Sequence, residues 1–203
     1  MPQNDCNKTA HGCFLHKILY MKIIAITLPA FFPQEAEAVN RLFASGRIDL
    51  LHLRKPGSDI GDCRKLLGKI AKEWLPRIVV HDHFTLCAEY GLHGCHLNSR
   101  NPTPPDGHCG SLSCSCHSLE EAARRKPLMD YVFLSPIFDS ISKQGYRSAF
   151  SDTTLREAAA AGIIDGKVIA LGGVTYGRIP LLEDYGFGGA AMLGEIWKEY
   201  AAH

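Results

Sequence analysis

The sequence predicts an α/β protein with a single (β/α)8 TIM-barrel domain. Short apolar runs alternate with segments of helical spacing along almost the whole chain. Most of these runs are apolar at consecutive positions, which is typical of strands buried on both faces of a parallel sheet. Eight such runs fit into a chain of 203 residues, about the length of one domain. Eight strands alternating with helices in one domain are the signature of this barrel.

The expected strands begin after a polar N-terminal segment. Residues 1–20 lack an apolar pattern, and we interpret them as an extension outside the fold, which leaves residues 21–203 for the barrel domain. Turn-forming residues bound the eight expected strands, which span residues 22–28, 49–54, 77–80, 94–97, 111–115, 130–134, 167–171 and 189–193. A doubly wound open sheet would carry a glycine fingerprint after its first strand. Residues 29–33 contain no glycine, so the pattern favours the barrel.

Apolar spacing of three and four residues predicts helices in most of the connections. The buried faces of the first two would be formed by Val39, Leu42 and Phe43, and by Cys63, Leu66, Leu67, Ile70 and Trp74. Further helices are expected over residues 119–125, 155–161, 179–185 and 196–202. Ser118 and Glu121 have the spacing of a capping box, which starts a helix right after His117. The fourth crossover is irregular, because residues 100–108 hold three prolines and a glycine.

Charge and composition narrow the class of partner. A formal net charge of +1 offers no basic field for nucleic acid or for an anionic membrane surface. No apolar run approaches the roughly 20 residues that a membrane-spanning helix needs. The first twenty residues also lack the apolar region of a secretory signal. We therefore expect a cytoplasmic protein that acts on small molecules, with no nucleic-acid or membrane partner and with a homo-oligomer left open.

The eight cysteines have no framework spacing, so we interpret them as free thiols in a reducing cytosol. The alternative is a zinc site built on Cys109, Cys114, Cys116 and His117. However, a Cys-x-Cys pair beside one histidine lacks the paired spacing of structural zinc sites.

Polar residues follow the expected strands, at the barrel end where active sites of this fold lie. They are His52, Arg54, Lys55, His81, Asp82, His83, His96, Asn98, Ser115, His117, Ser140, Ser142, Lys143, Gly172, Gly173 and Gly194. Cations and hydroxyls suit phosphate binding, and carboxylate oxygens suit magnesium. The glycines follow strands seven and eight, where backbone N–H groups of such barrels bind phosphate. We interpret His93 and His96 as structural and leave His52 open between packing and function.

Several motifs, in order, resemble the thiamin phosphate synthases and their TenI-type relatives, the thiazole tautomerases. His52-Leu-Arg54-Lys55 resembles the family's Gln-x-Arg-x-Lys, with the lysine displaced, and His81-Asp82 resembles its Asn-Asp. Residues 96–101 resemble His-x-Gly-Gln-x-Asp, and residues 114–117 match Val-Ser-x-His. Residues 135–143 resemble Gly-Pro-Ile-Phe-x-Thr-x-Thr-Lys, while Gly172-Gly173-Val174 and Leu193-Gly194 match the phosphate-binding ends of strands seven and eight. The similarity extends from Met21 to about Ala201.

This resemblance implies a (β/α)8 barrel that handles phosphorylated thiazole in thiamin biosynthesis. In a synthase, Mg²⁺ would be held by Asp82 and Asn101. Asn101 stands where the family has a second aspartate, so we expect weaker metal binding. The implied catalytic residues are Arg54, Ser115, His117 and Lys143. The residues implied to bind substrate and phosphate are His52, Arg54, Lys55, His81, Ser140, Ser142, Lys143, Gly172, Gly173 and Gly194.

Three activities fit the resemblance. Asp82 and the Ser-x-Ser-Lys loop favour a synthase that joins hydroxymethylpyrimidine diphosphate to thiazole phosphate. The replaced glutamine, lysine and aspartate favour a metal-independent tautomerase, in which His117 would move a proton on thiazole carboxylate phosphate. The third alternative is a protein that binds thiazole or thiamin phosphate without turnover. We favour the synthase, with the tautomerase as a close alternative.

Overall fold

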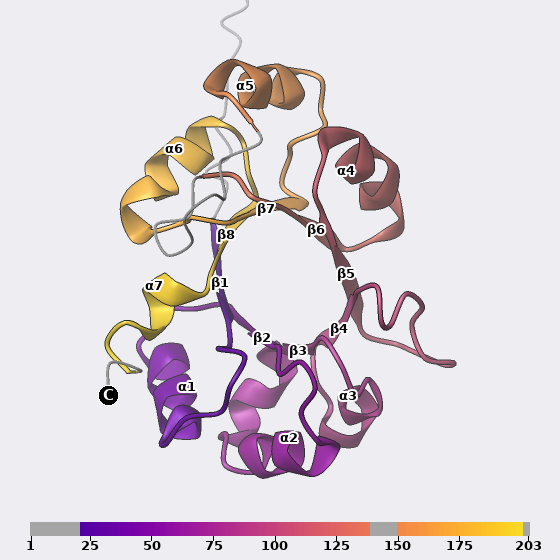
Figure 1. Cartoon of the computed structure of the whole chain (residues 1–203), viewed down its shortest axis with the longest axis vertical. Coiled ribbons are helices and arrows are strands. Elements are labelled where there is room, and N and C mark those ends of the chain that lie inside the picture. Colours follow the sequence, from indigo (N-terminus) through magenta and orange to yellow (C-terminus); the bar gives the residue numbers. More distant parts are fainter. Residues whose placement is uncertain (1–20, 139–149, 201–203) are drawn as a thin grey trace, which may run out of the picture.

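The computed structural model describes residues 21–138 and 150–200. Its eight strands are all parallel and close into a barrel in sequence order (Figure 1). They are β1 (Lys22–Ile26), β2 (Leu50–Leu53), β3 (Ile78–Val80), β4 (Gly94–Leu97), β5 (Ser111–Cys116), β6 (Tyr131–Leu134), β7 (Val168–Leu171) and β8 (Gly189–Met192). β1 pairs with both β2 and β8, which leaves no free sheet edge. The predicted barrel is confirmed, while the expected extension over residues 1–20 lies outside the described residues.

Helices surround the barrel on its outer side (Figure 1). They are α1 (Glu35–Ala44), α2 (Ile60–Leu67), α3 (Thr85–Tyr90), α4 (Leu119–Arg125), α5 (Asp152–Ala160), α6 (Ile179–Asp184) and α7 (Gly194–Trp197), with 3₁₀ turns η1 (Lys72–Arg77), η2 (Lys126–Leu128) and η3 (Tyr176–Arg178). The described part of the fourth crossover, residues 98–110, contains no helix. The irregular fourth crossover is therefore confirmed.

Two helices differ most from the expected ranges, and α5 begins at Asp152, three residues before its expected start. The second was expected to reach Trp74, but α2 ends at Leu67, followed by Gly68 as its C-cap. Trp74 lies instead in η1, where Pro76 prevents a regular helix, and its ring stacks on Phe43 at 5.4 Å. The helix expected over residues 196–202 is α7, which begins at Gly194 and ends at Trp197.

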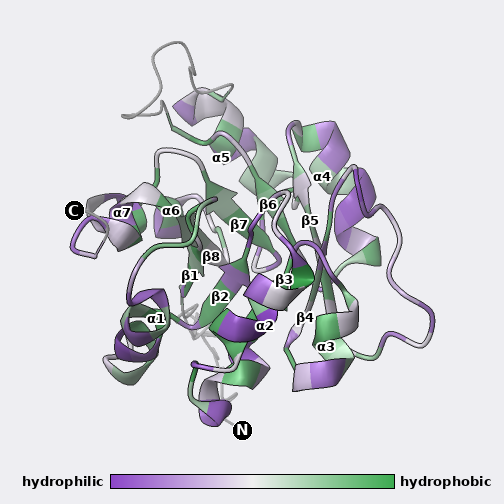
Figure 2. Ribbon diagram, turned by 60° about the horizontal axis from the view of Figure 1, so that its bottom comes forward, coloured by the Kyte–Doolittle hydropathy of each residue, from purple (hydrophilic) through white to green (hydrophobic). Residues whose placement is uncertain are grey.

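Strand alternation divides the apolar side chains into two cores. The larger core lies between the strands and the helices. A smaller core fills the barrel interior and comprises Ile24, Ile26, Leu50, Tyr131, Phe133, Ile169 and Ala191. Figure 2 shows the strands coloured mainly as hydrophobic, while α1, α2 and α4 carry hydrophilic residues. None of the described helices has the length and apolar character needed to span a membrane.

The same alternation rules out the zinc site considered above. Cys114 and Cys116 point outward from β5 into the larger core, whereas His117 lines a pocket at the barrel mouth. Cys109 is exposed on the fourth crossover. These four residues do not form a cluster with metal-ligand spacing, so that alternative was wrong. All the cysteines among the described residues are free thiols, as expected.

Candidate active site

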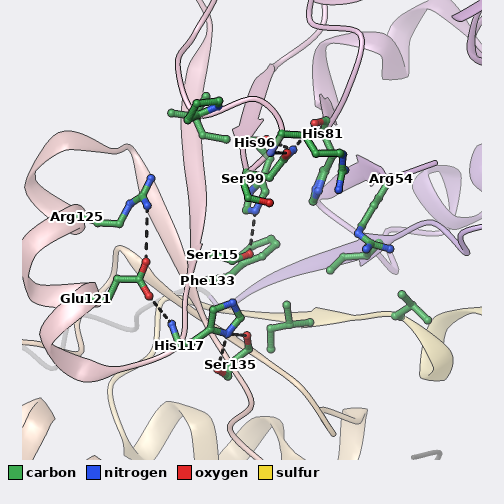
Figure 3. A pocket seen from close by; sticks show the side chains of 17 residues that line it. Arg54, His81, His96, Ser99, Ser115, His117, Glu121, Arg125, Phe133 and Ser135 are labelled. Atoms are coloured by element: carbon green, nitrogen blue, oxygen red, sulfur yellow. Dashed lines mark hydrogen bonds and ion pairs between the residues drawn. The ribbon is translucent and has the colours of Figure 1, made fainter. Parts of the chain in front are cut away.

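A pocket of about 590 Å³ opens at the carboxyl ends of the strands. Ile26, Leu171 and Leu193 line it from the ends of β1, β7 and β8, and Phe133 forms part of its floor. Its polar lining, partly labelled in Figure 3, comprises Arg54, His81, His96, Asn98, Ser99, Arg100, Ser115, His117, Glu121, Arg125 and Ser135. Side chains from every strand or the segment after it thus meet around one cavity.

Three arginines give this pocket a cationic wall. Arg54 follows β2, and its main chain is fixed by Thr27, whose hydroxyl accepts from Arg54 N at 2.9 Å and donates to Arg54 O at 3.0 Å. Among the described residues, its guanidinium has no ion-pair partner and lies toward the cavity (Figure 3). Arg125 extends from α4, where it pairs with Glu121 at 3.6 Å. Arg100 comes from the irregular crossover. Guanidinium groups bind phosphate oxygens through two parallel hydrogen bonds, so this wall suits phosphorylated ligands.

His117 is held at the end of β5, and its Nε2 has no hydrogen-bond partner among the described residues. Its Nδ1 lies 3.2 Å from the carbonyl oxygen of Ser135. The hydroxyl oxygen of Ser135 also lies 3.3 Å from Nδ1. In the tautomer that satisfies the carbonyl oxygen, which can only accept, Nδ1 carries the proton and Nε2 keeps its lone pair. The backbone N–H of His117 donates to Glu121 Oε2 at 2.9 Å, and Glu121 N donates to Ser118 Oγ at 3.1 Å. The Ser118 cap starts α4 at Leu119, as predicted, and the Glu121 side chain ties the backbone of His117 to the first turn of this helix.

Three histidines lie close together at the pocket floor. His52 is fully buried, and its Nδ1 lies 2.9 Å from Nε2 of His81. The other nitrogen of His52 lies 2.7 Å from the hydroxyl of Tyr131. The ring of His81 stacks on that of His96, with 4.2 Å between centroids. His52 therefore lies beneath the pocket, while His81 and His96 line it.

Burial keeps these three imidazoles neutral. Desolvation lowers the pKa of His52 and of His81 well below the ordinary value, and nearby His96 lowers both further. Desolvation, with smaller contributions from Arg125 and Arg54, lowers the pKa of His96 to about 3. The His96 nitrogens lie 2.9 and 3.0 Å from the hydroxyls of Ser113 and Ser115. His96 was interpreted as structural; it packs in the barrel and also lines the pocket.

Lys55 was expected to bind phosphate, but the structure does not bring it to this pocket. Its ammonium group donates to both carboxylate oxygens of Glu35, at 2.7 and 2.8 Å. It also donates to the carbonyl oxygens of Leu28 and Ala30, each at 2.9 Å. Both side chains of the ion pair are almost fully buried. The lysine thus holds the segment between β1 and α1 and has no donor left for a ligand.

The glycines expected to bind phosphate, Gly172, Gly173 and Gly194, are not part of the pocket lining. Gly172 directly follows the lining residue Leu171, and Gly194 directly follows Leu193. Gly172 has φ +94°, and an added Cβ would lie 2.8 Å from Pro136 Cα, so only glycine fits this turn. Gly173 uses its carbonyl to accept from Arg178 at 2.7 Å. Gly194 is the first residue of α7, and a Cβ there would meet no atom within 4 Å.

Comparison with known proteins decides the family. The family model described as thiamine monophosphate synthase matches residues 23–196, nearly all of the barrel. The chain belongs to this family.

Two relatives indicate how close the similarity is. The chain is 44% identical to thiamine phosphate pyrophosphorylase from Bacteroides thetaiotaomicron, whose crystal structure superposes with a TM-score of 0.82 over 90% of this chain and 87% of that one. It is 29% identical to thiamine-phosphate synthase from Pasteurella multocida over 66% of this chain. That alignment spans 62% of the Pasteurella protein, less than two thirds of its length. A Pyrococcus furiosus thiamine phosphate pyrophosphorylase, 18% identical over 88% of this chain and 91% of that one with a TM-score of 0.67, shows the shared fold.

The magnesium ligands expected from the family lie at the pocket rim. Asp82 accepts from the Arg100 guanidinium through both carboxylate oxygens, at 3.0 and 3.1 Å. Asn101 turns its amide nitrogen to Asp82, at 3.0 Å. One carboxylate already paired with an arginine is a poor site for a resident cation. The Asp82 carboxylate fits a Mg²⁺ ion that binds together with the substrate. Mg²⁺ is commonly bound by one or two carboxylates and by substrate phosphates.

The pocket gathers six residues of the expected set, and Asp82 and Asn101 lie at its rim. These six are Arg54, His81, His96, Asn98, Ser115 and His117. Ser140, Ser142 and Lys143 lie outside the described residues. The sequence did not single out Ser99, Arg100, Glu121, Arg125 or Ser135 as members of the site. Arg125 could have been found from its spacing of four residues after the capping Glu121, which places both on one face of α4.

Proposed function

We propose that this protein is a thiamin phosphate synthase, which couples hydroxymethylpyrimidine diphosphate to thiazole phosphate and releases diphosphate. Membership of the thiamine monophosphate synthase family and the 44% identical pyrophosphorylase support this activity. The structural observation that carries it is the wall of three arginines around a single cavity at the barrel mouth. Such a wall suits two substrates that both carry phosphate groups.

In this reaction the bond between the pyrimidine methylene carbon and the diphosphate oxygen breaks, and the thiazole nitrogen bonds to that carbon. Negative charge grows on the departing diphosphate. Arg54 and Arg100, which reach the pocket from different segments, would bind that charge and lower the barrier. A magnesium ion held by Asp82 and diphosphate would supply further positive charge there. The apolar lining from Ile26 and Phe133 would limit water around the reactive cation.

Replacing Arg54 with alanine should lower the rate of thiamin phosphate formation by about 10²–10³-fold, because one preformed donor to the developing charge is lost. The measurement is single-turnover product formation from pyrimidine diphosphate, thiazole phosphate and Mg²⁺. Arg64→Ala, which removes an exposed guanidinium paired with Glu89 on the outer side, is the matched control and should keep the wild-type rate. A wild-type protein that forms no product with Mg²⁺ or Mn²⁺ would exclude the synthase.

The lone pair on Nε2 of His117 favours a second candidate function, that of a thiazole tautomerase. Under that proposal His117 moves the proton on thiazole carboxylate phosphate. His117→Asn should then lower the aromatisation rate by about 10²–10⁴-fold and leave phosphate binding unchanged. Absorbance of the aromatic product measures the aromatisation rate, and calorimetry with thiazole phosphate measures phosphate binding. Full activity in this variant would rule out the acid/base role. Tight ligand binding with neither reaction would instead support a non-catalytic binding protein.

A further inference from the structure

A second cluster of side chains lies outside the active pocket, where the helixless fourth crossover meets the barrel. Cys87 comes from α3, Cys95 from β4, and His108 from the crossover at residues 98–110. The two thiols are buried, and the imidazole is half-buried. The Sγ of Cys95 lies 3.8 Å from Nδ1 of His108, and the three ligand atoms all lie within 4.8 Å of one another.

The orientation of His108 fixes which of its nitrogens is free. Its Nε2 lies 3.3 Å from the carbonyl oxygen of Ser111. Because that oxygen can only accept, Nε2 carries the proton, and the lone pair of Nδ1 faces the sulfur of Cys95. Metal-ligating histidines show the same arrangement, with the second nitrogen donating to a carbonyl or carboxylate.

The separation between Cys95 and His108 is close to that of a zinc site, and the two separations from Cys87 are at most 4.8 Å. Zn–S bonds of about 2.3 Å and Zn–N bonds of about 2.0–2.1 Å in a tetrahedron place sulfur about 3.5 Å from nitrogen and two sulfurs about 3.8 Å apart. The Cys95–His108 separation of 3.8 Å is within a few tenths of that value. Two thiolates also balance the charge of Zn²⁺, and this soft donor set favours zinc over magnesium or calcium.

We propose that Cys87, Cys95 and His108 bind a structural zinc ion, with the fourth position taken by solvent. The ion would fasten the fourth crossover to α3 and β4, in place of the packing that a helix provides in the other crossovers. Residues 98–100 of this crossover line the active pocket, so the ion would also fix part of the pocket rim. This role is independent of the reaction proposed above.

The histidines of the active pocket form the other possible metal cluster among the described residues. Their geometry is less suited, because His81 and His96 stack face to face at 4.2 Å and their in-plane lone pairs run side by side. Both nitrogens of His52 are also occupied, by His81 and Tyr131. That cluster is therefore an alternative metal site. The test must distinguish metal bound there from metal bound by Cys87, Cys95 and His108.

The test is metal binding by the reduced full-length protein. After chelation it is reconstituted with Zn²⁺ or with Co²⁺, and metal content and the Co²⁺–thiolate charge-transfer absorbance are measured. Wild type should bind about one ion per chain with the thiolate band. Cys95→Ser and His108→Asn should lose both. The controls are Cys63→Ser, a buried thiol of α2, and His93→Asn beside β4, which should bind as wild type does.

Hydrogen exchange of residues 98–110 is a second measurement. It compares wild type with His108→Asn, so it remains informative if Cys95→Ser folds poorly. Chelation should speed exchange there in wild type, while His108→Asn should exchange at the fast rate with or without zinc. Wild type that takes up neither metal would overturn the proposal, as would a Cys87–Cys95 disulfide in the protein purified from cells. Full binding by both ligand variants, with loss in His52→Gln, would place the metal in the pocket and also overturn it.

Discussion

Lowering the pH from about 7.5 to about 5.5 should reduce the free energy of unfolding by about 4 kcal/mol through three histidines alone. His52, His81 and His96 have folded-state pKa values well below 6.5 because they are buried. The unfolded chain therefore binds three protons that the folded chain does not. Stability is retained above about pH 7 and falls as the pH drops through 6.5, by about 1.4 kcal/mol per pH unit for each histidine.

Urea unfolding at the two pH values measures this loss. His52→Gln should reduce the loss by about one third, because it removes one of the three protons taken up on unfolding. The comparison uses the change between the two pH values in each variant, so an altered stability at neutral pH does not affect it. If His52→Gln and the wild type lose the same free energy, His52 is not part of the acid response.

Replacing Lys55 with methionine should lower the free energy of unfolding by about 3–5 kcal/mol, because it leaves the Glu35 carboxylate buried without its partner. The carbonyl groups of Leu28 and Ala30 lose the same donor. Adding Glu35→Leu should recover only part of this loss, since it removes the stranded charge but leaves those carbonyls unsatisfied. Urea unfolding of the single and double variants measures both effects.

Lys65→Met is the matched control for Lys55→Met. Lys65 pairs with Asp62 at 2.9 Å on the surface of α2, with 77% and 49% of the two side chains exposed. Solvent screens such a pair, so its loss should cost far less free energy of unfolding than the loss of the buried pair. Equal losses in the two variants would mean that the buried ion pair contributes no more than an exposed one.

The barrel could be predicted from the sequence because its signals are local. Consecutive apolar runs identified all eight strands to within two residues at either end, and three prolines identified the crossover without a helix. The end of α2 was harder to predict. Trp74 continues the apolar spacing of Cys63 and Leu66, although it belongs to a separate turn packed on Phe43. Periodicity records that a side chain is buried but not which element carries it.

The candidate site was predictable in part, where a residue's position along its strand settles its direction. Arg54, Ser115 and His117 were expected at the barrel mouth and line the pocket there. The fate of neighbouring Lys55 depends on Glu35, a residue twenty positions earlier whose approach no spacing rule reveals. Nor does the sequence show that Arg100, in the segment after β4, would pair with Asp82, in the segment after β3.

By itself, then, the sequence determined the order of the elements, the closed parallel sheet and the end of the barrel that carries the polar residues. Those properties follow from local hydrophobicity and turn chemistry, which neighbouring residues set together. Only the tertiary structure decided which charged groups remain available to a ligand and which are neutralised inside the protein. The reason is that hydrogen bonding and burial depend on groups brought together from distant segments, whose distances the one-dimensional pattern does not contain.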